Sequence, residues 1–289
     1  MKTVLGIYLF ILIGFVAKKG FEEIEAKTLV ILSTYFLQPF LTLWGIMLIP
    51  LNKELILAPI VYLVTVFVAL IFTYLFSAKL EKKEKIIASL TPLIGNTGNL
   101  GIPLSYAIFG EVGASVATLI NLANIFFIYS FGIFFFASGK YNFKNAFKKI
   151  IKIPVIWVGI LALTLNHYHI TFDKETMKIL QMGAFASIVT QLLIFGIYIA
   201  EIKIREVSFK LAFLTTFNKF VIFPLTAFIV LKFFNFNESV YKTILLEVLT
   251  PLAITNVNLA ALFDLYPRKV AFLILLTTFL FLIVSFLFI

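Results

Sequence analysis

Two short stretches of this sequence combine helix-breaking residues with asparagine and threonine. Residues 95–103 read GNTGNLGIP, and residues 249–258 read LTPLAITNVN. Inside a helix each glycine costs about 1 kcal/mol and each proline about 3 kcal/mol relative to alanine, so both stretches should interrupt their helices. Both lie within strongly apolar runs, where unpaired backbone is tolerated only beside protein or a water-filled cavity. We therefore expect the two stretches to line a cavity.

An interrupted helix can bind an anion without a basic side chain. The first N–H groups of its second half lack helical acceptors and carry the positive end of the helix dipole. Pro103 is expected to begin such a half-helix, where its missing N–H is harmless. In the alternative interpretation the helices are only kinked, and their asparagines join neighbouring helices. The candidate substrate-binding residues are Asn96, Thr97, Asn99, Gly101, Pro103, Thr250, Pro251, Asn256 and Asn258.

Two ionisable residues, Lys219 and Glu247, also lie deep within apolar runs. A lone charge at the centre of a bilayer costs about 2.5–3.5 kcal/mol on insertion scales, so each should have a partner or face water. Their runs are adjacent and antiparallel, which allows the two side chains to meet. They are candidates for proton or ion coupling, and the alternative is a structural ion pair, which is no evidence of function. No other carboxylate lies deep in a run, so we predict no metal site.

Neutral polar residues occur within other apolar runs as well: Gln38, Asn121, Asn124 and Gln191. Asn121 and Asn124 are about one helical turn apart. Either they border the cavity or they hydrogen-bond neighbouring helices, and the sequence favours neither interpretation.

The elements that position these residues must be membrane-spanning helices. The chain has 289 residues, of which 62% are hydrophobic and only 13% charged, whereas soluble domains have about 45–50% apolar and about 25% charged residues. Only helices or closed barrels satisfy their backbone in lipid, and the apolar runs lack the alternation of a barrel. Ten spans are predicted near residues 3–18, 28–49, 55–78, 86–109, 113–137, 153–170, 177–200, 208–234, 240–264 and 268–288.

The charged residues predict how these spans are oriented. Loops on one side hold 17 of the 24 Lys and Arg residues and loops on the other side hold six, with Lys219 inside a span. By the positive-inside rule the first side is cytoplasmic, so both termini are expected to be extracytoplasmic. The net charge of +10 therefore belongs to membrane insertion and lipid contact, and no nucleic acid partner is expected.

The chain divides into two halves of five spans each. Residues 140–152 read KYNFKNAFKKIIK, with apolar residues on one helical face and lysines on the other, a pattern typical of a helix lying in the cytoplasmic interface. This linker separates a first repeat, 1–139, from a second, 153–289. Because each repeat has an odd number of spans, the second enters the membrane inverted, and the two broken segments occupy equivalent fourth and ninth positions. Matched broken segments of this kind indicate the binding site of a secondary transporter.

The first broken segment resembles a specific family signature. Its pattern resembles the NTxxxGIPL motif of the auxin efflux carrier family, which includes plant auxin carriers and bacterial carriers for malonate or malate. The matching residues are Asn96, Thr97, Gly101, Ile102, Pro103, Leu104, Tyr106 and Gly110.

Two further segments are similar to looser patterns of the same family. The ninth span is similar to a second signature at Glu247, Pro251, Asn256, Ala260 and Phe263-Asp264. The residues Leu37-Gln38-Pro39-Phe40 resemble the family's Leu-Pro-Ala, with Gln38 as an extra residue. Unlike the plant carriers, the chain lacks a long central cytoplasmic loop.

The resemblance implies a fold related to bile-acid symporters and sodium/proton antiporters. Broken helices four and nine would cross at mid-membrane in a mobile transport domain, and spans one, two, six and seven would form a scaffold, often as a homodimer. The substrate would be an organic carboxylate such as malonate, malate or an auxin-like acid. Asn96, Pro103, Pro251 and Asn256 would frame its site. No cofactor is implied.

The predicted function is therefore secondary transport by alternating access, elevator-like, in the plasma (cell inner) membrane. An ion or solute channel is the first alternative. An intramembrane enzyme is a weaker one, because the sequence has no His-Glu-x-x-His motif, no cysteine and no pair of carboxylates for aspartyl chemistry.

Overall fold

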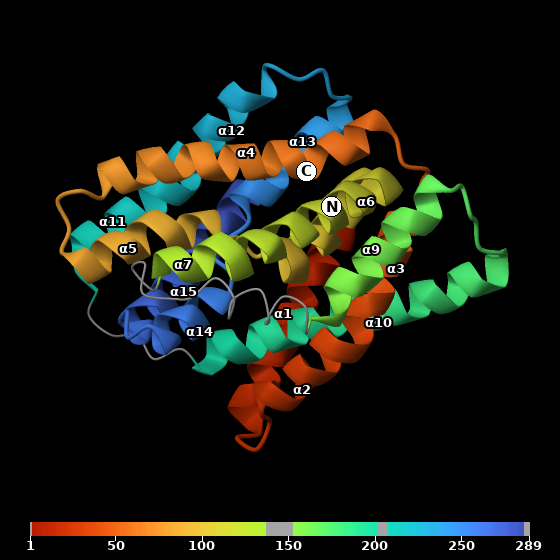
Figure 1. Ribbon diagram of the computed structural model, residues 1–289. Coiled ribbons are helices and arrows are strands. Elements are labelled where there is room, and N and C mark those ends of the chain that lie inside the picture. The colour runs from red at the N-terminus through yellow and green to blue at the C-terminus, as the bar shows by residue number, and fades with distance from the viewer. Residues whose placement is uncertain (1, 137–152, 202–206, 286–289) are drawn as a thin grey trace.

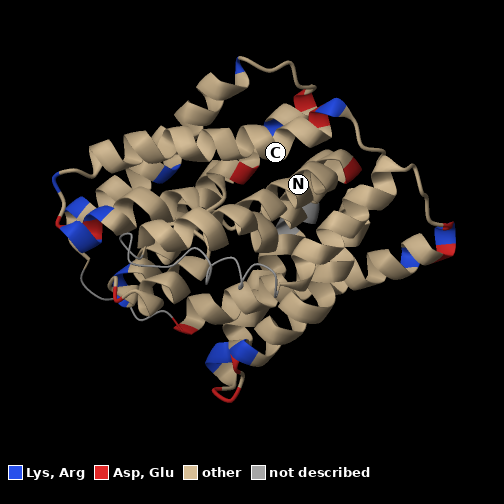
Figure 2. Ribbon diagram, viewed as in Figure 1, with Lys and Arg blue, Asp and Glu red and all other residues tan. Residues whose placement is uncertain are grey.

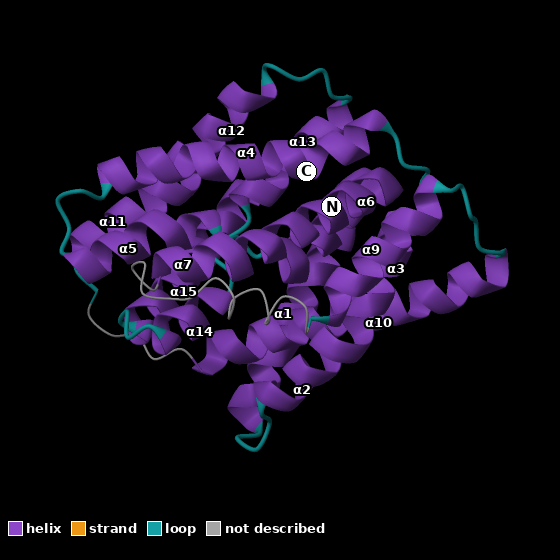
Figure 3. Cartoon of the chain, in the orientation of Figure 1, coloured by secondary structure: helices purple, strands orange, loops and turns teal. Residues whose placement is uncertain are grey.

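The computed structural model describes residues 2–136, 153–201 and 207–285, and over these residues the fold is helical, without strands (Figures 1 and 3). The predicted interfacial linker at 140–152 lies outside the described residues. The helices are α1 (Lys2–Gly20), α2 (Ala26–Leu32), α3 (Gln38–Met47), α4 (Lys53–Phe76), α5 (Lys82–Leu90), α6 (Ile102–Phe127), α7 (Ile133–Phe136), α9 (Pro154–His167), α10 (Lys174–Glu201), α11 (Phe209–Phe217), α12 (Phe223–Leu231), α13 (Glu238–Leu249), α14 (Thr255–Leu262) and α15 (Pro267–Ser285).

Short turns of other helix types interrupt several of these segments. A 3₁₀ turn, η2, covers Thr91–Leu93. The π-helical turns are η1 (Ser33–Leu37), η3 (Thr97–Gly101), η4 (Ile128–Gly132) and η5 (Asn218–Ile222). Single π-helical turns inside helices occur frequently at functional sites, and three of these four contribute residues to the cavity described below.

The chain is a multi-pass membrane protein. Within its described part, six helical segments are long and apolar enough to cross a membrane: Ala26–Met47, Lys53–Phe76, Thr97–Phe136, Lys174–Glu201, Phe209–Leu231 and Pro267–Ser285. The shorter apolar helix Pro154–His167 accompanies them.

This number is smaller than the ten predicted spans, which stay a prediction. The predicted span 3–18, which is α1, is not among the six, and the predicted span 153–170 contains only the shorter helix Pro154–His167. The segment Thr97–Phe136 combines the end of the predicted span 86–109 with nearly all of 113–137, and the chain turns between them at Gly110, which has φ +62°. A positive φ of this kind is accessible to glycine at little cost. The predicted span 240–264 is divided into two short helices, α13 and α14.

The helices form two groups that pack mainly within themselves (Figure 1). In one group α10 packs against α1, α2 and α3, and α3 packs against α9. In the other group α4 packs against α5, α6, α12 and α13. Gly14 and Gly196 let α1 and α10 approach closely, because a Cβ on either glycine would overlap the backbone of the other helix. Small residues commonly permit such contacts between membrane helices.

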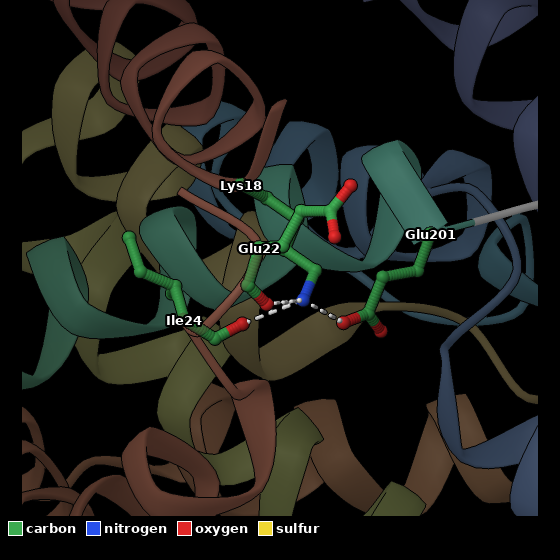
Figure 4. Close-up of polar contacts among 4 residues, drawn as sticks. All are labelled: Lys18, Glu22, Ile24 and Glu201. Carbon is green, nitrogen blue, oxygen red and sulfur yellow. Dashed lines mark hydrogen bonds and ion pairs between the residues drawn. The ribbon is translucent and has the colours of Figure 1, made fainter. Parts of the chain in front are cut away.

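Lys18 joins the ends of α1 and α10. Its ammonium donates to the carbonyl oxygens of Glu22 (2.9 Å) and Ile24 (2.8 Å) and pairs with the Glu201 carboxylate at 3.3 Å, as Figure 4 shows. The side chain therefore closes the loop after α1 and attaches it to the last residue of α10.

Most charged residues lie at the ends of helices (Figure 2). Lys83 pairs with Asp264 at 2.6 Å and Lys269 with Glu84 at 2.7 Å. At another pair of ends, Asn237 donates from both its backbone N–H and its side-chain amide to Glu54. In each contact, the Lys and Arg distribution assigns the two joined loops to the same side of the membrane.

The N-terminus of α10 is capped by Asp173. Its carboxylate accepts the N–H groups of Glu175 and Thr176 (both 2.9 Å) and the Thr176 hydroxyl. These hydrogen bonds, the Thr176 backbone bond first, hold the pKa of Asp173 below its usual range.

Candidate functional site

The two broken segments meet through their backbones. Gly95 and Leu252 form an isolated antiparallel bridge. The Asn96 N–H donates to the Pro251 carbonyl at 2.8 Å, and the Ala253 N–H donates to the Ile94 carbonyl at 2.9 Å. Each break therefore supplies partners for backbone groups that the other has freed from its helix, which satisfies the requirement for paired buried backbone. We call this contact the crossing.

Two buried asparagines hold the crossing in place. The Asn256 amide donates to the carbonyl oxygens of Ile94 (3.0 Å) and Ala253 (2.9 Å). The Asn124 amide donates to the Gly95 carbonyl and to the Thr97 hydroxyl, both at 3.0 Å. Carbonyl oxygens at the end of each first half-helix thus receive side-chain donors in place of the missing helical N–H groups.

A cavity of about 230 Å³ lies against the crossing. One wall comes from the broken segments and from α6, and the other comes from α2, η1, α3 and α10, so the cavity separates the two helix groups. Binding sites commonly occupy such boundaries. Its polar lining consists of Ser33, Thr34, Tyr35, Gln38, Asn96, Thr97, Asn99, Asn121, Asn124, Tyr129, Gln191, Tyr198, Thr255 and Asn258.

The lining is polar but uncharged. None of the described residues that line the cavity is Lys, Arg, Asp, Glu or His. The amide nitrogen of Asn96 is buried and has no hydrogen-bond partner among the described residues, and the same holds for the amide oxygen of Gln191. A buried polar group left unpaired costs about 1–3 kcal/mol. Asn96 is thus a residue of the cavity lining whose amide nitrogen is unpaired and lies beneath the cavity surface.

The structure divides the predicted substrate-binding residues into two sets. Those that line the cavity are Asn96, Thr97, Asn99 and Asn258. Those that lie outside its lining are Gly101, Pro103, Thr250, Pro251 and Asn256. The second set supports the crossing or packs behind it.

The second half of the first broken helix begins at Thr97, where η3 starts, rather than at Pro103 as predicted. Pro103 lies in the first turn of α6, which continues from η3. The sequence interpretation was wrong here because a π-helical turn rich in glycine can precede the proline. The free N–H groups at the start of the half-helix consequently belong to the turn that lines the cavity.

Several lining residues were not assigned to the site from the sequence. Asn121 and Asn124 were left between two interpretations, and the structure satisfies both, since they line the cavity and Asn124 also bonds the crossing. Gln38 and Gln191 add amides from the opposite wall. The only sequence signal for these residues is that they are polar within apolar spans.

Lys219 and Glu247 are both completely buried, but within the described chain no ion pair joins them. The Lys219 ammonium donates to the Pro92 carbonyl at 3.0 Å, and the Glu247 carboxylate accepts from the Ser105 hydroxyl at 2.9 Å. Lys219 thus lies at the carbonyl end of η2, where the dipole of the half-helix favours a positive charge. Glu247 lies beside Gly101 and Ser105, beyond the first turn of the half-helix that begins at Thr97.

The Lys219 ammonium also lies directly behind the cavity wall. A Cβ added to Gly95 would stand 3.2 Å from its nitrogen. The Glu247 carboxylate, which comes from α13, lies against the same broken helix farther along, where a Cβ on Gly101 would overlap it. The positive charge is thus adjacent to the lining without being part of it.

Comparisons with known proteins agree on a class. The model of a family described as membrane transport protein matches residues 1–289. The chain is 27% identical over 291 aligned positions to an uncharacterized transporter of Methanocaldococcus jannaschii, an alignment that covers 96% of this chain and 94% of that protein.

Among the described residues, no group of three or more His, Cys, Asp or Glu side chains could hold a metal ion.

Proposed function

This chain belongs to the membrane transport protein family, the family of the auxin efflux carriers, and we propose that it is a secondary active carrier of organic carboxylate anions. The resemblance found in the sequence is confirmed, and the family and its relative indicate a membrane transporter rather than an enzyme. The proposal specifies what is carried, where it binds and how it crosses.

The observation that carries the proposal is the unpaired amide of Asn96, a residue that lines an uncharged cavity at the crossing. A carboxylate oxygen would accept from this amide and from the N–H groups at the start of η3. Lys219, behind Gly95, adds positive potential without contacting the substrate. Because no charged side chain of the described lining faces the cavity, the empty site buries no fixed charge there, which favours return of the unloaded carrier.

The two helix groups support alternating access. We propose that the fold comprises ten spans in two inverted five-helix repeats, with the crossing near mid-membrane. The group of α1, α2, α3, α9 and α10 would be the scaffold, and the group that contains the crossing would move against it as in an elevator. The cavity lies between these groups, so movement of one group would carry the substrate with the crossing.

The cavity extends toward the predicted cytoplasmic side. Its lining includes Val30 near the start of the segment Ala26–Met47, Ile153 just before α9 and Tyr198 near the end of α10. These helix ends all fall on the side with the larger number of Lys and Arg residues. We propose that the structure is an inward-facing state of a homodimeric carrier in the plasma membrane, with both termini outside.

Transport into proteoliposomes tests this proposal. Vesicles containing the purified protein would be given labelled malonate, malate, an indole carboxylate or a neutral amide of each, with and without pH and Na⁺ gradients. We expect saturable uptake of a carboxylate and acceleration by the same unlabelled acid inside the vesicle, because a carrier exchanges substrate.

The controls distinguish the alternatives. Protein-free vesicles and the Asn96→Ala variant should show little uptake at the same substrate concentration. Uptake that does not saturate and is not accelerated by internal substrate would contradict the carrier and indicate a channel. Equal uptake of the neutral amides would contradict the carboxylate.

A further inference from the structure

A second, larger cavity of about 610 Å³ lies between α4, α5 and α7 and shares no residue with the first. We call it the lateral groove. Its lining is mainly aliphatic and aromatic, with two lysines. The lining residues that matter below are Leu70, Ile71, Tyr74, Leu75, Lys82 and Lys85.

The lateral groove faces the surroundings of the protein rather than its interior. Ile71 and Leu75 are 60% and 61% exposed, and Tyr74 is about half exposed. All three belong to α4, which lies in a candidate membrane span. Exposed apolar side chains on such a span contact lipid acyl chains, so the groove is open to the bilayer.

Both lysines of the groove lie in the first turn of α5. Lys85 places its ammonium 3.5 Å from the centroid of the Tyr74 ring, and this contact directs it over the groove. The residues between them turn away, because Lys83 pairs with Asp264 and Glu84 with Lys269. Within the described chain no ion pair involves Lys82 or Lys85. Two cationic groups therefore remain at one end of an apolar groove.

The spacing fits an amphiphile. From Lys82 to Leu90, the last residue of α5, the helix rises about 12 Å, and the apolar lining extends over that length. A ligand for this groove needs an anionic group at the lysine end and a hydrocarbon chain of about that reach. The lysine end is also the end that the Lys and Arg distribution places at the cytoplasmic membrane surface, where anionic lipid headgroups lie.

We propose that the lateral groove is a binding site for an anionic phospholipid. The phosphate lies between Lys82 and Lys85, and one acyl chain runs along Leu70, Leu75 and Leu90. This site is separate from the substrate cavity and does not depend on the identity of the substrate. Bound to α4 and α5, the lipid attaches to the helix group that carries the crossing.

Native mass spectrometry of the detergent-purified protein tests the site. The protein would be titrated with phosphatidylglycerol and with phosphatidylcholine of identical acyl chains. We expect phosphatidylglycerol to bind more tightly than phosphatidylcholine. In Lys82→Gln/Lys85→Gln the affinity for phosphatidylglycerol should fall about fivefold for each lysine removed, because one basic residue near an anionic headgroup contributes about this factor. The matched control is Lys174→Gln/Lys178→Gln, which removes two lysines one turn apart from the first turns of α10.

A second pair of variants tests the apolar part. Ile71→Trp fills the groove and should weaken the binding of both lipids. Ile60→Trp, at a position on the same helix that is half exposed and outside the groove, should weaken the binding of neither. These positions are exposed, so folding is retained.

Three results would overturn the proposal. The first is an unchanged preference for phosphatidylglycerol in Lys82→Gln/Lys85→Gln. The second is an equal loss in the α10 control, which would mean that only general surface charge is sensed. The third is displacement of the lipid by millimolar glycerol phosphate, which would mean that the acyl chain adds nothing.

Discussion

Asn96 and Asn256 belong to corresponding broken segments, but their side chains have different partners. Asn96 belongs to the cavity lining and its amide nitrogen has no partner among the described residues, whereas the Asn256 amide donates to two carbonyl oxygens of the crossing. From the sequence alone both were expected to hold the substrate. We therefore propose that Asn96 binds the carboxylate, whereas the hydrogen bonds of Asn256 hold the crossing in place.

The first prediction follows from this difference. Asn96→Ala should weaken carboxylate binding roughly ten- to a hundredfold with an unchanged melting temperature, since one hydrogen bond to a charged group contributes about 1.5–3 kcal/mol. Asn256→Ala should lower the melting temperature, because two buried hydrogen bonds to carbonyl oxygens are lost. Calorimetric binding and thermal unfolding of both variants measure this. An Asn256→Ala protein of normal stability with a hundredfold weaker affinity would contradict the assignment.

The second prediction concerns Lys219 and Glu247. Removing one charge leaves the other buried and uncompensated, so Lys219→Met and Glu247→Gln should each be destabilising, and the double variant should be more stable than their sum predicts. Thermal unfolding of the three proteins measures the coupling free energy. Strictly additive losses would show that the two charges are not coupled and that each is balanced by its own hydrogen-bond partners. A transport rate that no longer depends on pH in the double variant would support the coupling role.

At the scale of elements, the important feature is that η3 packs directly against the Glu247 carboxylate, with no room for a side chain at Gly101. Our third prediction is that Gly101→Ala destabilises the protein by about 1–3 kcal/mol, because the new methyl group overlaps the buried carboxylate. Gly6→Ala is the matched control, since a Cβ on Gly6 in α1 meets nothing within 4 Å. Thermal unfolding compares them. Equal stability of the two variants would mean that Glu247 does not lie against η3.

The interruptions of the helices were predictable in part. Gly95 and Pro251 lie at the two breaks, because the effect of glycine and proline on a helix depends on the local backbone, whereas Pro103 lies inside the helix that continues from η3. The π-helical turns at Ser33–Leu37 and Asn218–Ile222 each precede a proline by two residues, Pro39 and Pro224, but the sequence analysis did not predict them. No single residue type requires a π-helical turn, and packing against neighbouring helices decides where the extra residue is accommodated.

At the scale of the whole molecule, the orientation in the membrane yields the fourth prediction. Reporter fusions after Ile289 and at Asn145 should give opposite readouts, with Ile289 outside and Asn145 in the cytoplasm. Fusions near Glu54 and Asn237 should agree with each other and with Ile289, because a hydrogen bond joins these two loops. The same compartment for Ile289 and Asn145 would contradict two inverted five-span repeats.

The sequence by itself determined the properties that sum over local residues. Composition placed the chain in a membrane, because apolar runs have a favourable transfer free energy whatever their neighbours. The glycines and prolines determined that two segments break, and the motif around Asn96 determined the family, which the match over residues 1–289 confirms. The side of each loop was predicted from Lys and Arg counts and remains a prediction.

Only the tertiary structure decided which side chains meet. It bonded Asn256 to the Ile94 carbonyl, gave Lys219 and Glu247 separate partners at Pro92 and Ser105, and brought Gln38 and Gln191 to the cavity. Each of these contacts joins residues far apart in the chain. The partners of a polar group within a span depend on how helices rotate and pack around it, and the order of residues along one helix does not determine that rotation.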